Sequence, residues 1–184
     1  MAGLAYEEYY TIDDYKHWED NWELIDGKPY AMAPSPMFDH QYIITKIARI
    51  LDEQLDKCPE CYPAVEIDWQ ISKDTIVRPD VLVVCKKEQK IKSTPKIVFE
   101  VVFDSSIKRD EQIKFKLYEK EGVFYYALAY PDQKRVKLYQ LTNFQYKKIA
   151  DFTNEGVFEL SIKDCSINFD TKLLWKKLYN KSST

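Results

Sequence analysis

The sequence reads RPDVLVVC at residues 78–85 and KIVFEVV at residues 96–102. Runs rich in Val, Leu and Ile are typical of buried strands, yet each run carries one acid, Asp80 or Glu100. An unpaired charge in such a place costs much free energy, so a buried acid is normally tolerated because it binds a cation, pairs with a base or accepts hydrogen bonds. The two segments therefore predict two strands whose acids share a divalent-metal site.

The proposed metal site needs the two strands to pair. The residues between Asp80 and Glu100 are numerous enough to return the chain, so that both carboxylates could meet at one hard cation such as Mg²⁺. The backbone carbonyl of Val102, two residues beyond Glu100 on the same strand face, is the expected further ligand. A metal ion held in this way can deprotonate a water molecule and polarise a phosphoryl oxygen.

Apolar spacing predicts the surrounding elements. Two long helices are expected over 39–57 and 107–121, and the second places Asp110, Lys114 and Tyr118 on one face. Strands are expected at 65–72, 75–85, 96–103, 123–129, 135–141, 145–152 and 157–161. A helix over 11–18, a strand over 23–27, an extended segment over 30–33 that ends at residues 34–36, and an amphipathic segment over 173–179 are added at the ends. This order predicts an α/β (α+β) fold with a mixed central sheet flanked by helices and with extra N-terminal and C-terminal elements.

The size and composition suit one domain over residues 1–184. The chain is 45% hydrophobic and 15% aromatic, which argues against disorder. No apolar run approaches the roughly 18 residues of a membrane span, and the N-terminus lacks the pattern of a signal peptide. We therefore expect a cytoplasmic protein without a membrane segment.

Charge is distributed unevenly along the chain. The formal net charge is -3, but the first 26 residues hold eight acids and one lysine, which leaves about +4 on the remainder. Such basic residues are usually a solvated surface, but they also suit the phosphate backbone of a nucleic acid. The residues expected to bind nucleic acid are Lys86, Lys87, Lys90, Lys92, Lys108 and Arg109.

Other site chemistries have little support. Of the four cysteines, only Cys58 and Cys61 are close in sequence. A zinc site would need two more ligands at comparable spacing, and a thioredoxin-like site would need the pair to open a helix, whereas here it follows one. Four glycines supply no phosphate-binding loop, and no serine-hydrolase motif is present.

The sequence resembles a known family. The resemblance to the Uma-two family of restriction endonucleases, a branch of the PD-(D/E)XK nuclease superfamily, lies in Pro79-Asp80, the strand 100–102, Asp110, Lys114, Tyr118 and Gly122-Val123. It extends from residues 23–27 through His40-Gln41 to about Pro131. The resemblance implies a restriction-endonuclease-like core in which Asp80 and Glu100 bind Mg²⁺ (or Mn²⁺).

The resemblance also implies roles for other residues. The superfamily has a lysine two positions after the second acid, where this chain has Val102, but the Uma-like branch carries its lysine on the following helix, where Lys114 falls. Lys114 is therefore expected to reach the metal-bound water or the phosphate. Glu23 and His40 match further family positions, and Asp110 is expected to act as a partner of Lys114. The chain departs from the family pattern at Phe103, Ala127 and Tyr130.

Each residue also has a structural explanation. Asp80 could satisfy neighbouring backbone amides, and Glu100 could pair with Arg78. Lys114 could be solvated or pair with Asp110 one turn before it. His40 could cap or pack its helix, and the acid at residue 66 is expected to face solvent.

Three functions follow from these alternatives. The first is an Mg²⁺-dependent endonuclease that acts on nucleic acid, with DNA favoured over RNA, as a homodimer when both strands are cut. The second is a catalytically inactive nuclease-fold module that binds nucleic acid or protein. The third is a structural homodimer with an aromatic surface.

Overall fold

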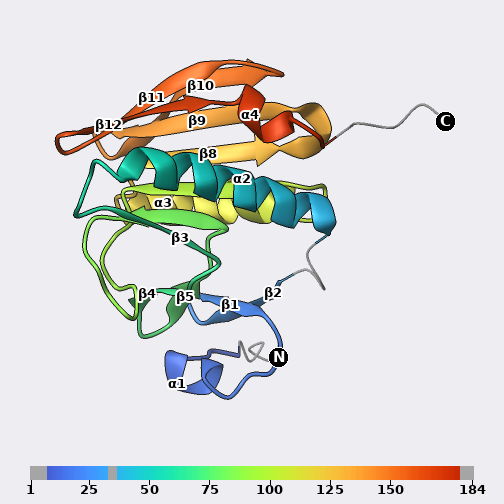
Figure 1. The fold of residues 1–184 in the computed structure, drawn as a ribbon. Coiled ribbons are helices and arrows are strands. Elements are labelled where there is room, and N and C mark those ends of the chain that lie inside the picture. The colour runs from blue at the N-terminus through green and yellow to red at the C-terminus, as the bar shows by residue number, and fades with distance from the viewer. Residues whose placement is uncertain (1–7, 33–36, 179–184) are drawn as a thin grey trace.

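The chain folds into two β-sheets, a β-hairpin and the helices around them, as Figure 1 shows for a computed structural model that describes residues 8–32 and 37–178. The helices are α1 (Ile12–Tyr15), α2 (Phe38–Leu55), the π-helix η1 (Arg109–Lys114), α3 (Phe115–Lys120), the 3-10 helix η2 (Pro131–Gln133) and α4 (Lys172–Trp175). The strands are β1 (Trp22–Ile25), β2 (Lys28–Ala31), β3 (Tyr62–Val65), β4 (Trp69–Ser72), β5 (Thr75–Val77), β6 (Val81–Val84), β7 (Ile97–Val101), β8 (Tyr125–Tyr130), β9 (Arg135–Thr142), β10 (Gln145–Thr153), β11 (Val157–Ile162) and β12 (Cys165–Asp170).

The larger sheet holds the two acid-bearing segments near its centre. Its strand order is β10-β9-β8-β7-β6-β3, in which β7 and β8 are parallel and the other neighbours are antiparallel. The chain crosses from β7 to β8 through η1 and α3, because parallel neighbours need a crossover connection. The predicted mixed sheet with flanking helices is therefore confirmed.

Alternate residues of the central strands face two separate apolar cores. On one face, Val81 and Phe99 belong to a core with α2, the β11–β12 hairpin and α4. On the other face, Leu82 and Val98 belong to a core with α3 and β4. Glu100 shares this second face with Val98, because side chains alternate along a strand. Its carboxylate is therefore directed toward the helices that follow β7.

The smaller sheet lies on the opposite side of α2 from β8 and β9 (Figure 1). Its strand order is β2-β1-β5-β4, and α1 lies next to it. The predicted start of α1 is confirmed, since the Thr11 amide donates to the Asp14 carboxylate at 2.8 Å in a capping box. This sheet brings β1, and with it Glu23, to the edge of the central strands.

Two predicted strands are each divided between the two sheets. The sequence predicts one strand over 65–72, but the chain turns at Glu66, whose φ is 46°, so that β3 joins the larger sheet and β4 the smaller one. Residues 75–85 likewise form β5 and β6, because Pro79 has no amide hydrogen to continue a ladder. The second break places Asp80 where the two sheets meet.

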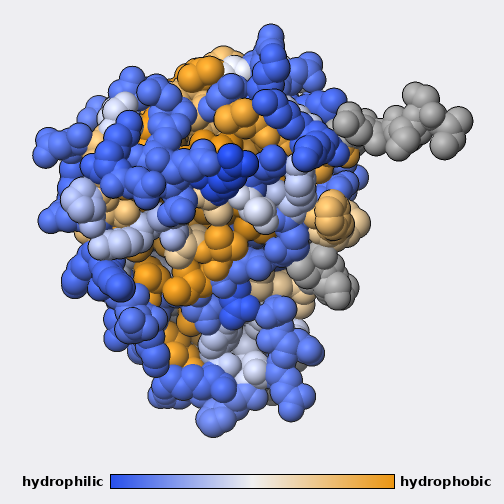
Figure 2. Space-filling view, viewed as in Figure 1, coloured by the Kyte–Doolittle hydropathy of each residue, from blue (hydrophilic) through white to orange (hydrophobic). Residues whose placement is uncertain are grey.

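The outer strand β3 is partly exposed. Pro63 suits this edge position, since it cannot donate to a neighbouring strand, and Tyr62 and Val65 are 41% and 42% exposed. Figure 2 shows hydrophobic residues gathered on this face below α2. The strand ends next to Glu66, so the exposed edge leads to the site described below.

The C-terminal elements differ in part from the prediction. Strand β12 was not predicted, although Ile167 and Phe169 alternate with polar residues as strand residues do. The expected segment over 173–179 is α4, which ends at Trp175, and Tyr179 lies outside the described residues. The predicted break at residues 34–36 also lies outside them. Across the described part of the chain, none of the helices combines the length and the apolar character needed to span a bilayer.

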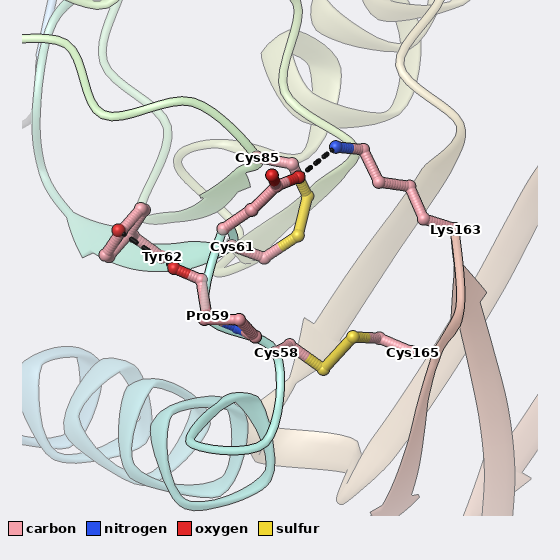
Figure 3. The surroundings of a disulfide bond; sticks show 8 residues. Cys58, Pro59, Cys61, Tyr62, Cys85, Lys163 and Cys165 are labelled. Atoms are coloured by element: carbon pink, nitrogen blue, oxygen red, sulfur yellow. Dashed lines mark hydrogen bonds and ion pairs between the residues drawn. A yellow bond between two sulfur atoms is a disulfide. The ribbon is translucent and has the colours of Figure 1, made fainter.

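The four cysteines form two disulfides (Figure 3). Cys58 is bonded to Cys165 of β12, and Cys61 to Cys85 at the end of β6. The turn between α2 and β3 is thereby tied to both the hairpin and the larger sheet. The close cysteine pair therefore serves as two structural crosslinks in this structure. Disulfides are typical of oxidising compartments and rare in the cytoplasm. The two disulfides therefore do not support the expected cytoplasmic location, which stays a prediction.

Candidate active site

Asp80 lies at the junction of the two sheets and opposite Glu100. Val81 pairs with Phe99 in the antiparallel β6–β7 ladder, so the next residues along the register are Asp80 and Glu100. Opposite residues of such a pair point to the same face. The Val101 amide donates to Asp80 Oδ2 at 2.6 Å, and the Asp80 amide donates to Glu100 Oε2 at 3.4 Å. The predicted pairing of the two acid-bearing strands is confirmed.

Glu100 belongs to a buried group of four side chains that we call the Lys114 network. Lys114 Nζ lies 2.8 Å from Glu23 Oε1 and 3.0 Å from Glu100 Oε1. The Tyr118 hydroxyl donates to Glu100 Oε1 at 2.8 Å. Each of the four residues is at most 2% exposed. The lysine therefore binds two carboxylates from two different sheets, away from solvent.

The helix after β7 explains why these groups converge. Asp110, Lys114 and Tyr118 follow at the four-residue spacing that predicts one helix face, and the structure shows that all three are buried. Their helix begins as the π-helix η1, a form that is frequent at functional sites. Asp110 Oδ1 lies 3.5 Å from Arg109 Nε, and no described ion pair joins it to Lys114.

Lys114 and Glu100 form other ion pairs than the simple alternatives. Lys114 pairs with Glu23 and Glu100. Burial raises the pKa of Asp110, and the charge of Lys114 opposes this rise without a direct ion pair among the described residues. Arg78 Nε lies 2.7 Å from Asp68 Oδ1, and the cation bound to Glu100 is Lys114. Both differences arise because β1 and the segment just before β4 supply Glu23 and Asp68, whose positions the sequence could not predict.

A cavity of about 480 Å³ opens beside Asp80. Its walls include His40 at the start of α2, Glu66 between β3 and β4, and Arg109 and Asp110 of η1. The Lys114 network is not among the described residues that line it, so the network lies behind the wall formed by Asp80. We call this space the site cavity.

His40, Glu66 and Asp80 form a candidate metal-ligand group on the wall of the site cavity. One ligand atom of each lies within 4.8 Å of the others. His40 Nε2 is 3.4 Å from Asp80 Oδ2, and the Gln41 side chain donates to Glu66 Oε1 at 3.0 Å. His40 therefore contacts the site, as the family position implied.

Glu66 is a site residue that the sequence did not indicate. The side chain is exposed, as expected, but the left-handed turn at this residue brings it beside Asp80. The sequence feature that could have indicated Glu66 is an acid directly after an apolar strand, but acids in such positions are common on ordinary protein surfaces.

The buried charges shift one another's pKa values. Burial raises the pKa of Asp80, but the His40 ring and the Lys114 charge outweigh it, so the pKa lies below its usual value. Burial raises the pKa of Glu100 well above normal, against the effect of Lys114. Burial lowers the pKa of Lys114, but the carboxylates of Glu100 and Glu23 outweigh this and raise it. Asp80 is therefore held as a carboxylate and Lys114 as an ammonium.

The remaining predicted site residues lie elsewhere. Val102 is buried, and its amide donates to the Ala129 carbonyl at 2.7 Å. Its role as a carbonyl ligand stays a prediction. Arg109 is partly buried on the wall of the site cavity. The other residues expected to bind nucleic acid are exposed: Lys86, Lys87, Lys90, Lys92 and Lys108.

Comparison with known proteins identifies a family and a similar structure. The Uma2 family, described as "Putative restriction endonuclease", matches residues 6–168. Among the solved structures, one similar chain is described as a "putative nuclease belonging to DUF820" from Anabaena variabilis ATCC 29413. It is 14% identical with a TM-score of 0.73, and the match covers 91% of this chain and 98% of that chain. No curated protein matches. At this identity, the structural likeness concerns the fold.

Proposed function

Because this chain belongs to the Uma2 (Uma-two) family of restriction endonucleases, we propose that it is a metal-dependent nuclease of the PD-(D/E)XK type. It would hydrolyse phosphodiester bonds, with DNA favoured over RNA. The observation that carries the proposal is the position of Asp80. Asp80 belongs to the cavity-facing group with His40 and Glu66, and it also lies opposite Glu100 where β6 pairs with β7.

The charge of the site supports a bound cation. The bases of the site are Lys114, Arg109, the ring of His40 and Arg78, whose guanidinium is paired with Asp68. More acids than bases lie there: Glu23, Glu66, Asp80, Glu100 and Asp110. Buried carboxylates without enough positive charge are costly. A divalent cation would supply the missing charge.

The residues present fit Mn²⁺ or Mg²⁺. Carboxylate oxygens suit both ions, and an imidazole nitrogen suits transition metals, so we expect Mn²⁺ to bind more tightly than Mg²⁺. His40 Nδ1 is buried and has no hydrogen-bond partner among the described residues, so a bound group could satisfy it. Asp80, His40 and Glu66 would hold the ion from the cavity side. Glu100, behind Asp80, is the candidate ligand from the other side, and the Val102 carbonyl is a further one.

The chain's own residues would bind and orient the substrate. When bound, the metal ion supplies an activated water and stabilises negative charge on the phosphate. The guanidinium of Arg109 lines the site cavity and would bind phosphate oxygens. Lys114 acts as a positioning residue, because it fixes Glu100 and Glu23 beside Asp80. The exposed lysines Lys86, Lys87, Lys92 and Lys108 would contact neighbouring phosphates.

The test is cleavage of plasmid and single-stranded DNA by the purified protein with Mg²⁺, Mn²⁺ or EDTA. We expect cleavage that needs the metal and is lost in Asp80→Ala. Asp164→Ala, which changes an exposed acid between β11 and β12, is the matched control and should cleave normally. Equal cleavage by Asp80→Ala and the wild type would overturn the proposal.

One observation favours a second function, the inactive nuclease-fold module that binds nucleic acid or protein. The Lys114 ammonium faces Glu23 and Glu100 and is not among the described residues of the cavity wall. Salt-sensitive DNA binding without metal binding in calorimetry would support this function.

A nuclease that cuts both strands is expected to be a homodimer, which analytical ultracentrifugation would test.

A further inference from the structure

We propose that a second cavity, next to the site cavity, binds an unpaired nucleobase of the substrate beside the phosphate to be cut. This proposal rests on the proposed function for its choice of ligand, because a nucleic acid must lie over Asp80 for its base to reach this place. It goes beyond that function by naming a subsite and by requiring an unpaired base in it.

The second cavity, which we call the base cavity, has a volume of about 530 Å³. This volume is in the usual range for small-ligand sites, about 300–1,000 Å³. Glu66 and Arg78 line both cavities. Arg78 is fixed in this shared wall, since its guanidinium donates to Asp68 at 2.7 Å and to Asn21 at 2.8 Å. A nucleic-acid strand that is bound over Asp80 therefore needs only to extend past Arg78 to place one of its bases in the base cavity.

Three aromatic side chains line the base cavity. Tyr15, Trp18 and Trp22 come from α1, the segment after it and β1, and all three are half-buried. The ring centroids of Tyr15 and Trp18 are 5.5 Å apart at 62°, and those of Trp18 and Trp22 are 5.9 Å apart at 67°. These are edge contacts, so the rings do not stack on one another. Aromatic rings that border a cavity in this way provide surfaces on which bases can stack.

The charge of the lining favours a neutral ligand. The cations and carboxylates of the wall are equal in number: Lys16, Arg78 and Lys90 against Asp20, Glu66 and Asp68. A balanced wall does not select an anionic phosphate. Gln70 and Gln89 add side-chain amides that can donate and accept hydrogen bonds. A nucleobase combines an aromatic face with hydrogen-bonding edges, so it matches both properties of the wall.

The fluorescence of the tryptophans at this cavity gives the test. Trp69 and Trp175 are at most 8% exposed, so quenching by an added base reports on Trp18 and Trp22. A short oligothymidylate and an abasic strand of the same length are titrated into the full-length protein in EDTA. We expect quenching by the oligothymidylate and at least about tenfold weaker binding of the abasic strand. Equal affinities for the two strands would overturn the proposal, and this comparison needs no variant.

Variants of Trp18 separate stacking from packing. Trp18→Leu keeps an apolar side chain but removes the ring, and we expect it to bind the oligothymidylate about tenfold more weakly. Trp18→Phe should restore most of the affinity. Phe144→Leu changes an aromatic residue between β9 and β10 that is 91% exposed, and it should bind as the wild type does. Wild-type affinity in a folded Trp18→Leu protein would contradict the role of the ring.

The outcomes distinguish this proposal from the proposed function. Base-dependent quenching by a protein that does not cleave with Mg²⁺ or Mn²⁺ supports the base cavity and overturns the nuclease function. Metal-dependent cleavage with equal binding of normal and abasic strands overturns the base cavity alone. If the protein shows no cleavage and no base-dependent binding, both the nuclease function and the base cavity are overturned.

Discussion

Replacing Lys114 by Met perturbs the buried ion pairs without emptying the space that the lysine fills. The change leaves Glu23 and Glu100 buried without the ammonium that lies 2.8 and 3.0 Å from them. Removing one partner of a buried ion pair costs about 3–5 kcal/mol. For a chain of 184 residues, this predicts a fall in Tm of about 6–20 °C.

Urea unfolding followed by circular dichroism measures this loss. We expect Lys114→Met to lower the midpoint without changing the m-value. Lys116→Met, an exposed position on α3, is the matched control and should stay within about 0.5 kcal/mol of the wild type. Adding Glu23→Gln to Lys114→Met should recover part of the loss, with a coupling free energy of at least about 1 kcal/mol. A Lys114→Met protein as stable as the wild type would refute the burial and pairing of this lysine.

Two further predictions concern stability and pH. Replacing both cysteines of the Cys58–Cys165 disulfide, separated by 107 residues, by Ser should lower the free energy of unfolding by about 4.8 kcal/mol. The same change at the Cys61–Cys85 disulfide, separated by 24 residues, should lower it by about 3.4 kcal/mol, because the shorter loop loses less closure entropy. A larger loss from the shorter loop in urea unfolding would contradict this reasoning. Hydrogen bonds from the amides of Ser93 and Lys92 lower the pKa of Glu88 to about 2. The stabilising effect of the Glu88 carboxylate is therefore complete above its unfolded pKa of about 4.3 and is lost as the pH falls through about 2. A Glu88 carboxyl that titrates above pH 4 by NMR would exclude these contacts.

The central part of the fold and site could be predicted because its signals are local. Asp80 and Glu100 each interrupt an apolar run, and burial of those runs forces both acids to find partners. The spacing of Asp110, Lys114 and Tyr118 likewise fixes them on one helix face. These patterns predict that the strands pair and that the helix points its polar face at the acids.

The other features depend on contacts between distant parts of the chain. Alternation over residues 65–72 predicts a strand, but it contains no information on the two sheets between which that strand is divided. The left-handed turn at Glu66 is unfavourable for a residue with a side chain, so no sequence signal predicted that Glu66 lies beside Asp80. Helix lysines are mostly solvated, and Lys114 is buried because β1 brings Glu23 to it from another sheet. The pairing of Cys58 with Cys165 similarly joins distant segments.

The claim that Asp80 centres a metal site is tested most directly by titrating Mn²⁺ into the protein in a calorimeter. The wild type and Asp164→Asn should bind the ion with equal affinity, whereas Asp80→Asn should lose binding, since Asp80 belongs to both candidate ligand sets. Glu66→Gln and Glu100→Gln should each weaken binding by a smaller amount. Undiminished Mn²⁺ binding by Asp80→Asn, or no binding by the wild type, would contradict the proposed site.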